Sequence, residues 1–188
     1  MTEIRIHGRG GQGTVLASSV LAQALVEEGK YVVAVPSFGF ERRGAPVAAF
    51  LRVSDREIRA MTNIYHPDII LCIDPTVGRT VDIFAGMGPG GTLVQSTKAE
   101  LDAVKLGPNV AKVGLCDAVT IALKIFNKPI TNSVMLGAFA KTTGMVKLDS
   151  LKAALETTEF RDAGLKQNMD AIAQGYEGTI VHTVGGHA

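Results

Sequence analysis

The sequence predicts an α/β protein, a single three-layer α/β/α domain built around a mostly parallel β-sheet. Two features predict it. Short apolar segments, typical of buried strands, alternate along the chain with longer segments whose apolar residues recur at helical spacing. The first strand-like segment also runs directly into a glycine-rich turn and then into a helix, an order typical of sheets with parallel strands.

Apolar runs predict six strands, at residues 3–7, 31–35, 47–53, 69–73, 92–96 and 110–115, and a short antiparallel return at 58–61. Helical spacing predicts helices after Gly13 and over 76–84, 118–126, 133–143, 151–158 and 162–175. Asp117 and Asn132 stand where two of these helices should have their N-caps. The helix after Gly13 would connect the first two strands as a βαβ crossover.

The whole chain, residues 1–188, is predicted to form one domain, because neither a repeat nor a linker divides it. Residues 176–188 are set apart as a C-terminal tail. This tail mixes glycine with Ile180, Val181 and Val184, so it cannot easily form a core of its own. We expect it to lie on a partner or to fray.

With 19 basic and 18 acidic residues the net charge is +1, which argues against the broad basic face of a nucleic-acid-binding protein. Hydrophobic residues make up 46% of the chain. Even so, apolar runs such as residues 69–73 fall far short of the roughly 20 residues that a membrane span needs. The N-terminus lacks the layout of a signal peptide. The sequence therefore predicts a soluble cytoplasmic protein that binds neither nucleic acid nor a membrane.

Cys72 and Cys116 lie far apart in apolar segments, and neither belongs to a C-x-x-C pair. We interpret them as buried reduced thiols that pack as small hydrophobic groups. The histidines show no metal-ligand spacing. The sequence thus predicts that this chain alone holds neither an iron–sulfur cluster nor a zinc ion.

The first candidate site is the segment His7–Gly13, with the sequence His-Gly-Arg-Gly-Gly-Gln-Gly. Gly8, Gly10 and Gly13 satisfy the G-x-G-x-x-G pattern between a predicted strand and a predicted helix. Open backbone N–H groups and the positive helix N-terminus suit a phosphate or a carboxylate. The alternative is that the glycines only let the helix pack closely on the sheet.

An NAD-type dinucleotide site is a weak interpretation of this loop. Such a site needs an acidic residue near the end of the second strand, about 20 residues beyond the glycines, to hold the ribose. That position holds Val35, Pro36 and Ser37. The sequence also has neither a P-loop lysine after the glycines nor a G-x-S-x-G nucleophile elbow.

The second candidate stretch, residues 37–46, is too charged for a strand and too punctuated for a helix. Its three neighbouring charges, Glu41, Arg42 and Arg43, would usually form a solvated surface. Here glycines on both sides, among them Gly44, and a following proline restrict the backbone. We therefore predict an ordered loop with a binding or interface role.

Together these two stretches resemble the gamma subunit of pyruvate:ferredoxin oxidoreductases and related 2-oxoacid oxidoreductases. The resemblance rests on His7–Gly13 followed by Phe38–Val47, and it continues through Tyr65–Asp68, Ile73–Pro75 and Ile130–Asn132. It covers about residues 3 to 150. The tail from Tyr176 onward is longer than the usual ending of this family.

The resemblance implies a subunit of a complex that converts a 2-oxoacid to an acyl-CoA by oxidative decarboxylation and passes electrons to ferredoxin or another acceptor. Coenzyme A would be the co-substrate. Thiamine diphosphate and [4Fe-4S] clusters would belong to partner subunits of alpha, beta and delta type. The gamma subunit would help to close the active site and to receive coenzyme A. It implies no catalytic residue here, and the cofactor-binding candidates are Gly8, Arg9, Gly10, Gly11, Gln12 and Gly13 in the first loop, with Glu41, Arg42, Arg43 and Gly44 in the second.

Two other functions stay open: a free-standing Rossmann-like, nucleotide-dependent oxidoreductase, and a non-catalytic scaffold subunit. The subunit interpretation predicts that the chain alone has no oxidoreductase activity and binds no chromophore. The second stretch resembles the pyruvate branch more than the 2-oxoglutarate branch, and aromatic or branched 2-oxoacids remain candidates. If the arginines contact coenzyme A, Arg9→Ala or Arg43→Ala should raise its KM by about 10 to 150-fold. Gly10→Val should do more harm than Gln12→Ala.

Overall fold

The computed structural model describes residues 1–37, 44–157 and 164–185, and these ranges contain one mixed sheet of seven strands in the order β2-β3-β1-β4-β5-β6-β7. Five strands run in one direction, and β3 and β7 run against them. The predicted α/β class and mostly parallel sheet are confirmed, as are all six predicted strands. The strands are β1 (Thr2–Arg9), β2 (Tyr31–Ser37), β3 (Pro46–Ser54), β4 (Ile69–Cys72), β5 (Gly91–Ser96), β6 (Val110–Cys116) and β7 (Ile180–Thr183).

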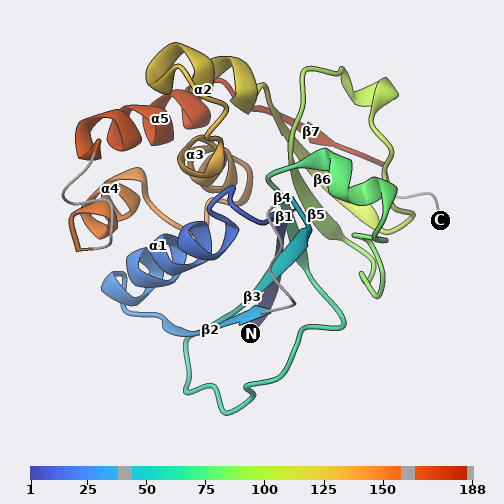
Figure 1. Ribbon diagram of the computed structural model, residues 1–188. Helices are drawn as coiled ribbons and strands as arrows, with labels where there is room; N and C mark the ends of the chain where they lie inside the picture. Colours follow the sequence, from blue (N-terminus) through green and yellow to red (C-terminus); the bar gives the residue numbers. More distant parts are fainter. Residues whose placement is uncertain (38–43, 158–163, 186–188) are drawn as a thin grey trace.

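The α-helices of the described ranges gather on one face of the sheet (Figure 1). They are α1 (Thr14–Glu27), α2 (Ala118–Phe126), α3 (Asn132–Thr143), α4 (Leu148–Thr157) and α5 (Leu165–Glu177). The other face is covered by loops and two short 3₁₀ helices, η1 (Pro75–Arg79) and η2 (Leu101–Ala103), so the third layer is not built of α-helices as expected. The helix predicted over 76–84 shrinks to η1 because glycine and β-branched residues there disfavour further turns. In these ranges no helix has the length and apolar character that crossing a membrane requires.

Two hydrophobic cores lie on the two faces of the sheet. Successive side chains of β1 point alternately into one core and toward the other. Ile4 and Ile6 are fully buried against the helices. Arg5 and His7 point to the opposite face, where Ile70 of β4 packs with the loops. The sheet therefore carries buried charge on its loop-covered face, close to the strand that leads into the glycine loop.

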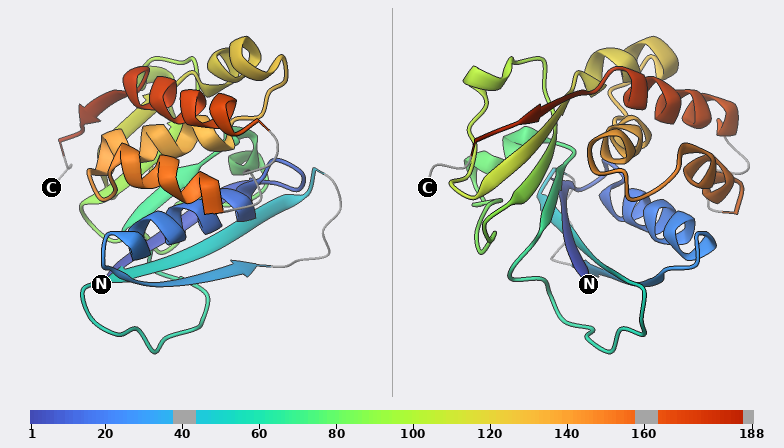
Figure 2. Two further views of the ribbon diagram at one scale, coloured as in Figure 1. Left: turned by 90° about the vertical axis from the view of Figure 1, so that its left-hand side faces the viewer. Right: turned by 180° about the vertical axis from the view of Figure 1, so that it is seen from behind.

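The first crossover differs from the expected one. β1 and β2 run parallel, but β3 lies between them and pairs antiparallel with both. No strand forms at 58–61, because this stretch lies in the loop that extends below the sheet in Figures 1 and 2. The chain thus leaves β1 toward one side of the sheet, whereas β4 lies on the other side. This reversal makes the carboxyl ends of β1 and β4 a topological switch point, where α/β proteins bind ligands.

The capping predictions have mixed outcomes. The Asp117 side chain accepts a hydrogen bond from the Thr120 N–H at 3.1 Å, which confirms it as the N-cap of α2. Asn132 was expected to cap α3, but Thr131 holds that position and Asn132 is the first helical residue. Its side chain is buried instead under the glycine loop, close to Gly13.

The described part of the C-terminal segment, residues 176–185, is not frayed: most of it belongs to α5 and to a strand of the sheet. Tyr176 and Glu177 complete α5, and β7 then pairs antiparallel with β6. The unpaired edge of β6 and the β-branched Ile180 and Val181 favour this added strand. The sheet therefore ends with a strand from the predicted tail.

Helices α3 and α5 cross at unusually short range because each contributes a glycine. A Cβ atom on Gly137 would overlap the carbonyl oxygen of Ile172, and a Cβ atom on Gly175 would overlap that of Val134. The two backbones are therefore in direct contact. This contact fixes the position of α3, whose first turn underlies the glycine loop.

Candidate functional site

The glycine loop connects the end of β1 at Arg9 to the start of α1 at Thr14. Gly11 and Gly13 have φ angles of 86° and 73°, a left-handed conformation that side chains rarely adopt. Gly13 occupies the N-cap of α1, and no side chain of the described residues caps this helix. The first N–H groups of α1 have no partner within the helix, so the helix N-terminus is open to an anion.

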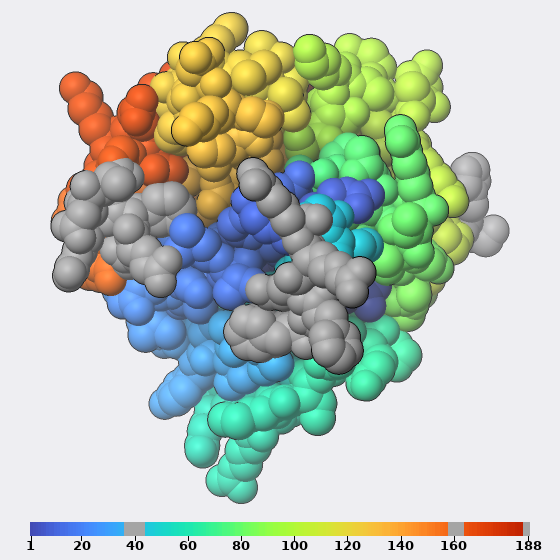
Figure 3. Space-filling model, viewed as in Figure 1, coloured from blue at the N-terminus to red at the C-terminus, as the bar shows by residue number. Residues whose placement is uncertain are grey.

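The two stretches singled out in the sequence meet at this loop. The Gly10 N–H donates to the Ala45 carbonyl at 2.9 Å, and the Gly44 N–H donates to the Gly10 carbonyl at 3.1 Å. Figure 3 shows the glycine loop in blue beside the cyan segment that begins near residue 44 and the green segment after β4. Glu41, Arg42 and Arg43 lie outside the described residues. Gly44 brings the end of their stretch to the glycine loop.

Asp74, at the end of β4, is the centre of the hydrogen bonds that hold the glycine loop. Its Oδ2 accepts from Gln12 Nε2 at 2.6 Å. Its Oδ1 accepts from the backbone N–H and the hydroxyl of Thr76, at 2.8 and 2.6 Å. Burial by itself would raise the pKa of Asp74, but the hydrogen bonds from Thr76 and Gln12 and the charge of Arg9 hold this pKa below its usual value. Asp74 is therefore an ionised anchor between β4 and the loop.

Arg9 also acts within this network. Its Nε donates to the Thr76 hydroxyl at 2.8 Å, its Nη2 to the Thr76 carbonyl at 3.0 Å, and its Nη1 to the Gly44 carbonyl at 2.8 Å. Its Nε also lies 3.7 Å from Asp74 Oδ2. The guanidinium thus links both candidate stretches to η1, and we treat Arg9 as a brace of the loop.

Gln12 fixes the turn from within. Its Oε1 accepts from the Arg9 N–H at 2.8 Å, while its amide nitrogen reaches Asp74. Beneath the turn, the side chain of Asn132 is 3% exposed and lies against the Cα of Gly13. Asp74, Thr76 and Asn132 have no role in the site that was predicted from the sequence. For Asp74 a signal existed, since an acidic residue directly follows a predicted parallel strand.

A cavity of about 300 Å³ lies over this loop, lined by the glycine loop, the first turns of α1 and the start of β3. Its residues are Arg9, Gly10, Gly11, Gly13, Thr14, Val15, Leu16, Ser19 and Val47. The cavity opens onto the uncapped N-terminus of α1. Its size and its N–H groups fit a phosphate or carboxylate group with part of a larger molecule.

Metal-binding groups do not gather anywhere in the described residues: no cluster there contains three His, Cys, Asp or Glu side chains suited to a metal ion. Cys72 and Cys116 are both buried, and they pack in different cores on opposite faces of the sheet. Burial, with the nearby Asp74 charge, raises the pKa of the Cys72 thiol to about 12. It is therefore an unreactive packing group in the folded chain.

His7 gives the chain a specific pH dependence of stability. It is 4% exposed, and burial, together with the charge of Arg5, lowers its pKa from 6.5 to about 4. The unfolded chain binds this proton between pH 6.5 and 4 and the folded chain does not, so stability falls as the pH is lowered through this window. We expect a loss of about 3 kcal/mol in the free energy of unfolding across this window.

Urea unfolding of the wild type and of His7→Leu at several pH values tests this expectation. The leucine variant should lack this part of the pH dependence, since it has no titrating ring. Parallel pH curves for the two proteins would contradict the assignment to His7.

These features define the chain as an α/β protein with an anion-ready glycine loop, braced by an aspartate, at the switch point of its sheet. Comparison of the sequence with known protein families identifies its family. The model of the pyruvate ferredoxin/flavodoxin oxidoreductase family matches residues 3–178, and the chain belongs to this family. It is a gamma subunit of a 2-oxoacid oxidoreductase, an enzyme that acts on oxo groups, and it works with other subunits.

The relatives are similar over nearly their whole length. The gamma subunit of the NADH-dependent phenylglyoxylate dehydrogenase of Aromatoleum evansii is 65% identical, over 98% of this chain and 97% of the relative. The common gamma subunit of the pyruvate/ketoisovalerate oxidoreductases of Thermococcus litoralis is 48% identical, over 97% and 99%. The crystal structure of the pyruvate oxidoreductase subunit PORC of Thermotoga maritima matches with a TM-score of 0.81 at 35% identity, over 96% and 97%.

Proposed function

We propose that this chain receives coenzyme A in a multisubunit 2-oxoacid:acceptor oxidoreductase of the cytoplasm and helps to close its active site. The observation that carries the proposal is the cavity over the glycine loop, which opens onto the uncapped N-terminus of α1. Coenzyme A carries phosphates, and the free N–H groups of a helix start bind phosphate without a charged side chain. The proposed binding residues are Gly8 to Gly13, together with Glu41, Arg42, Arg43 and Gly44.

The structure supports a division of work between backbone and side chains in this site. The side chains of Arg9 and Gln12 make their hydrogen bonds within the protein, to Thr76, Gly44 and Asp74. The N–H groups at the start of α1 therefore remain for the ligand. A loop fixed before binding loses little conformational freedom when coenzyme A arrives, which favours affinity.

The remaining chemistry belongs to partner subunits in this proposal. Alpha, beta and delta types would supply thiamine diphosphate and [4Fe-4S] clusters, and ferredoxin or another acceptor would take the electrons. The two cysteines of this chain, buried in separate cores, do not fit as cluster ligands. Thiamine diphosphate, when bound in the complex, supplies carbanion stabilisation, and this chain positions the acyl acceptor.

An aromatic 2-oxoacid is the first substrate to test, and pyruvate and branched 2-oxoacids are the next. The relative at 65% identity is named for phenylglyoxylate and for dependence on NADH, whereas the relative at 48% identity is named for pyruvate and ketoisovalerate. The higher identity favours the aromatic acid and makes NAD an acceptor to test beside ferredoxin. Turnover of the whole complex against a panel of 2-oxoacids and acceptors decides between them.

Gly10→Val tests the coenzyme A site. Gly10 lines the cavity and, unlike Gly11 and Gly13, does not have a positive φ, so a valine there narrows the cavity without left-handed strain. We expect the KM for coenzyme A to rise by about 10 to 150-fold, equivalent to losing one charge-assisted contact. Reduction of the complex by the 2-oxoacid without coenzyme A should stay nearly unchanged.

The matched control is Gly88→Val, which places the same side chain at an exposed glycine with open space around its Cα. Steady-state kinetics and stopped-flow reduction should be measured on complexes shown to be intact by gel filtration. An unchanged KM in Gly10→Val would exclude the cavity as the coenzyme site. Disassembly of the Gly10→Val complex would support the alternative of a non-catalytic scaffold subunit. Reduction of NAD by the isolated chain would support the alternative of a free-standing oxidoreductase.

A further inference from the structure

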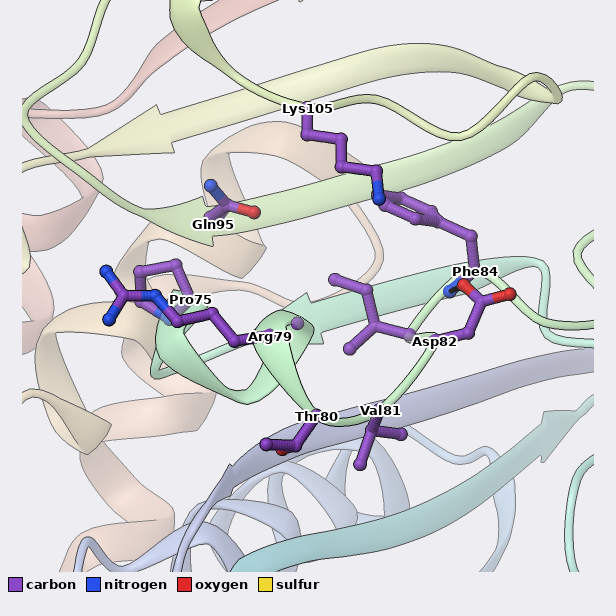
Figure 4. Close-up of a pocket in the computed structure, with 10 residues that line it drawn as sticks. Pro75, Arg79, Thr80, Val81, Asp82, Phe84, Gln95 and Lys105 are labelled. Carbon is purple, nitrogen blue, oxygen red and sulfur yellow. Dashed lines mark hydrogen bonds between the residues drawn. The ribbon is translucent and has the colours of Figure 1, made fainter.

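A second cavity lies at the carboxyl edge of the sheet, after β4 and β5, and its lining shares no residue with the glycine-loop cavity. Its volume is about 480 Å³, which is within the range of small-molecule sites. The walls come from residues 75–84, from Gln95 at the end of β5 and from Lys105 (Figure 4). None of these positions has a function predicted from the sequence.

Gln95 is the polar group of this cavity that lacks a partner. Its side chain is only 9% exposed, yet no described residue forms a hydrogen bond with its amide. Figure 4 shows this amide on the cavity side of β5, opposite the segment that carries Pro75 and Arg79. Neither atom of this amide is among the completely enclosed polar atoms of the described residues, so the amide opens into the cavity, where a ligand can pair with both its N–H and its carbonyl.

The charges around the cavity favour an anion. Arg79 and Lys105 are exposed, and neither makes an ion pair or a side-chain hydrogen bond with the described residues. The acidic residue of the lining, Asp82, accepts from the Phe84 N–H at 3.0 Å. Burial lowers the pKa of Arg5, and the negative charge of Asp82 opposes that shift.

The apolar wall of the cavity is held in place from below. Arg5 Nη2 donates to the carbonyls of Ile83 and Ala85, both at 2.8 Å. These bonds fix the backbone on each side of Phe84, which lines the cavity together with Lys105 (Figure 4). A rigid aromatic ring, a free amide and two free cations thus line one pocket.

We propose that this cavity binds a purine nucleotide. The Phe84 ring provides a surface for base stacking, and the Gln95 amide offers one donor and one acceptor to the edge of the base. Arg79 and Lys105 bind the phosphates. This site goes beyond the proposed function, which concerns the glycine-loop cavity. Its chemistry is shared by free adenine nucleotides and by the nucleotide part of coenzyme A.

Calorimetric titration of the full chain and of its complex with ADP, NADH and coenzyme A tests the proposal. Gln95→Leu keeps the size of the side chain and removes both hydrogen-bonding groups, so it should weaken nucleotide binding by about 10-fold or more. Lys105→Ala should also weaken it. Lys98→Ala, which removes an exposed lysine outside the cavity, is the matched control and should leave the Kd unchanged.

The source of the nucleotide follows from the same titrations. Binding of ADP or NADH that depends on Gln95 supports a free nucleotide, and a dependence on Gln95 for coenzyme A alone supports its nucleotide part. If none of the three binds to the wild type, or if all bind Gln95→Leu with unchanged Kd, the proposal is wrong. Gly10→Val separates it from the proposed function, because that variant should affect coenzyme A and leave ADP binding unchanged.

Discussion

Replacing Asp74 with alanine is expected to lower the free energy of unfolding by about 3 kcal/mol and to raise the KM for coenzyme A by about 100-fold. The carboxylate accepts hydrogen bonds from Gln12 and from two groups of Thr76, and it faces the Arg9 guanidinium. Its loss leaves these donors without an acceptor. It also frees the glycine loop from β4, and a displacement of about 1 Å in a binding loop is enough for a loss of this size.

Urea unfolding of the chain and coenzyme A kinetics of the complex measure the two effects. Asp74→Asn should be milder, because its carbonyl oxygen can still accept from Thr76. Asp102→Ala removes an exposed carboxylate from η2 and serves as the control. Wild-type stability together with a wild-type KM in Asp74→Ala would show that the loop does not depend on this anchor.

Gly175→Ala should lower the free energy of unfolding by about 3 kcal/mol, although it adds a single methyl group and alanine favours helices. The new Cβ atom would overlap the Val134 carbonyl oxygen, which is backbone and cannot rotate away. The helices α3 and α5 must then separate. Gly137→Ala should act in the same way, through the Ile172 carbonyl.

The double variant tests whether the two glycines serve one contact. Once one alanine has separated the helices, the second should cost clearly less, so the two effects should not add. Gly88→Ala, at a glycine with open space, should change stability by a few tenths of a kcal/mol. A stabilised Gly175→Ala would mean that helix propensity outweighs the close contact.

The local sequence pattern was sufficient to predict the six strands and the glycine loop. The central strand β4 is a run of aliphatic residues, β1 alternates isoleucine with polar residues, and the loop lies where the strand pattern of β1 changes to the helical pattern of α1. The order of β3 in the sheet could not be predicted in this way. The pattern of residues 47–53 requires burial on both faces of a sheet, and a place next to β1 or at the far side of β2 satisfies this requirement equally.

For the site, too, local sequence pattern predicts only part of the structure. Residues Gly8 to Gly13 predict an anion-binding turn by themselves. A glycine at positive φ and an open helix N-terminus both depend on the local sequence only. Asp74, Asn132 and Gln95 are distant in sequence from that turn and from each other. Their neighbouring residues do not indicate what they contact. Asp74 and Gln95 come to the site because parallel strands bring their carboxyl ends to one edge, and Asn132 because the start of α3 packs under Gly13.

The sequence by itself therefore determined the α/β class, the positions of the six predicted strands, the glycine turn and the family resemblance. All of these depend on residues that are neighbours along the chain. Tertiary structure alone decided that the helices share one face, that residues 180–183 complete the sheet, and that Arg9 braces the loop through Asp74 and Thr76. These outcomes depend on packing and on hydrogen bonds between distant segments, whose free energies exist only once the chain has folded.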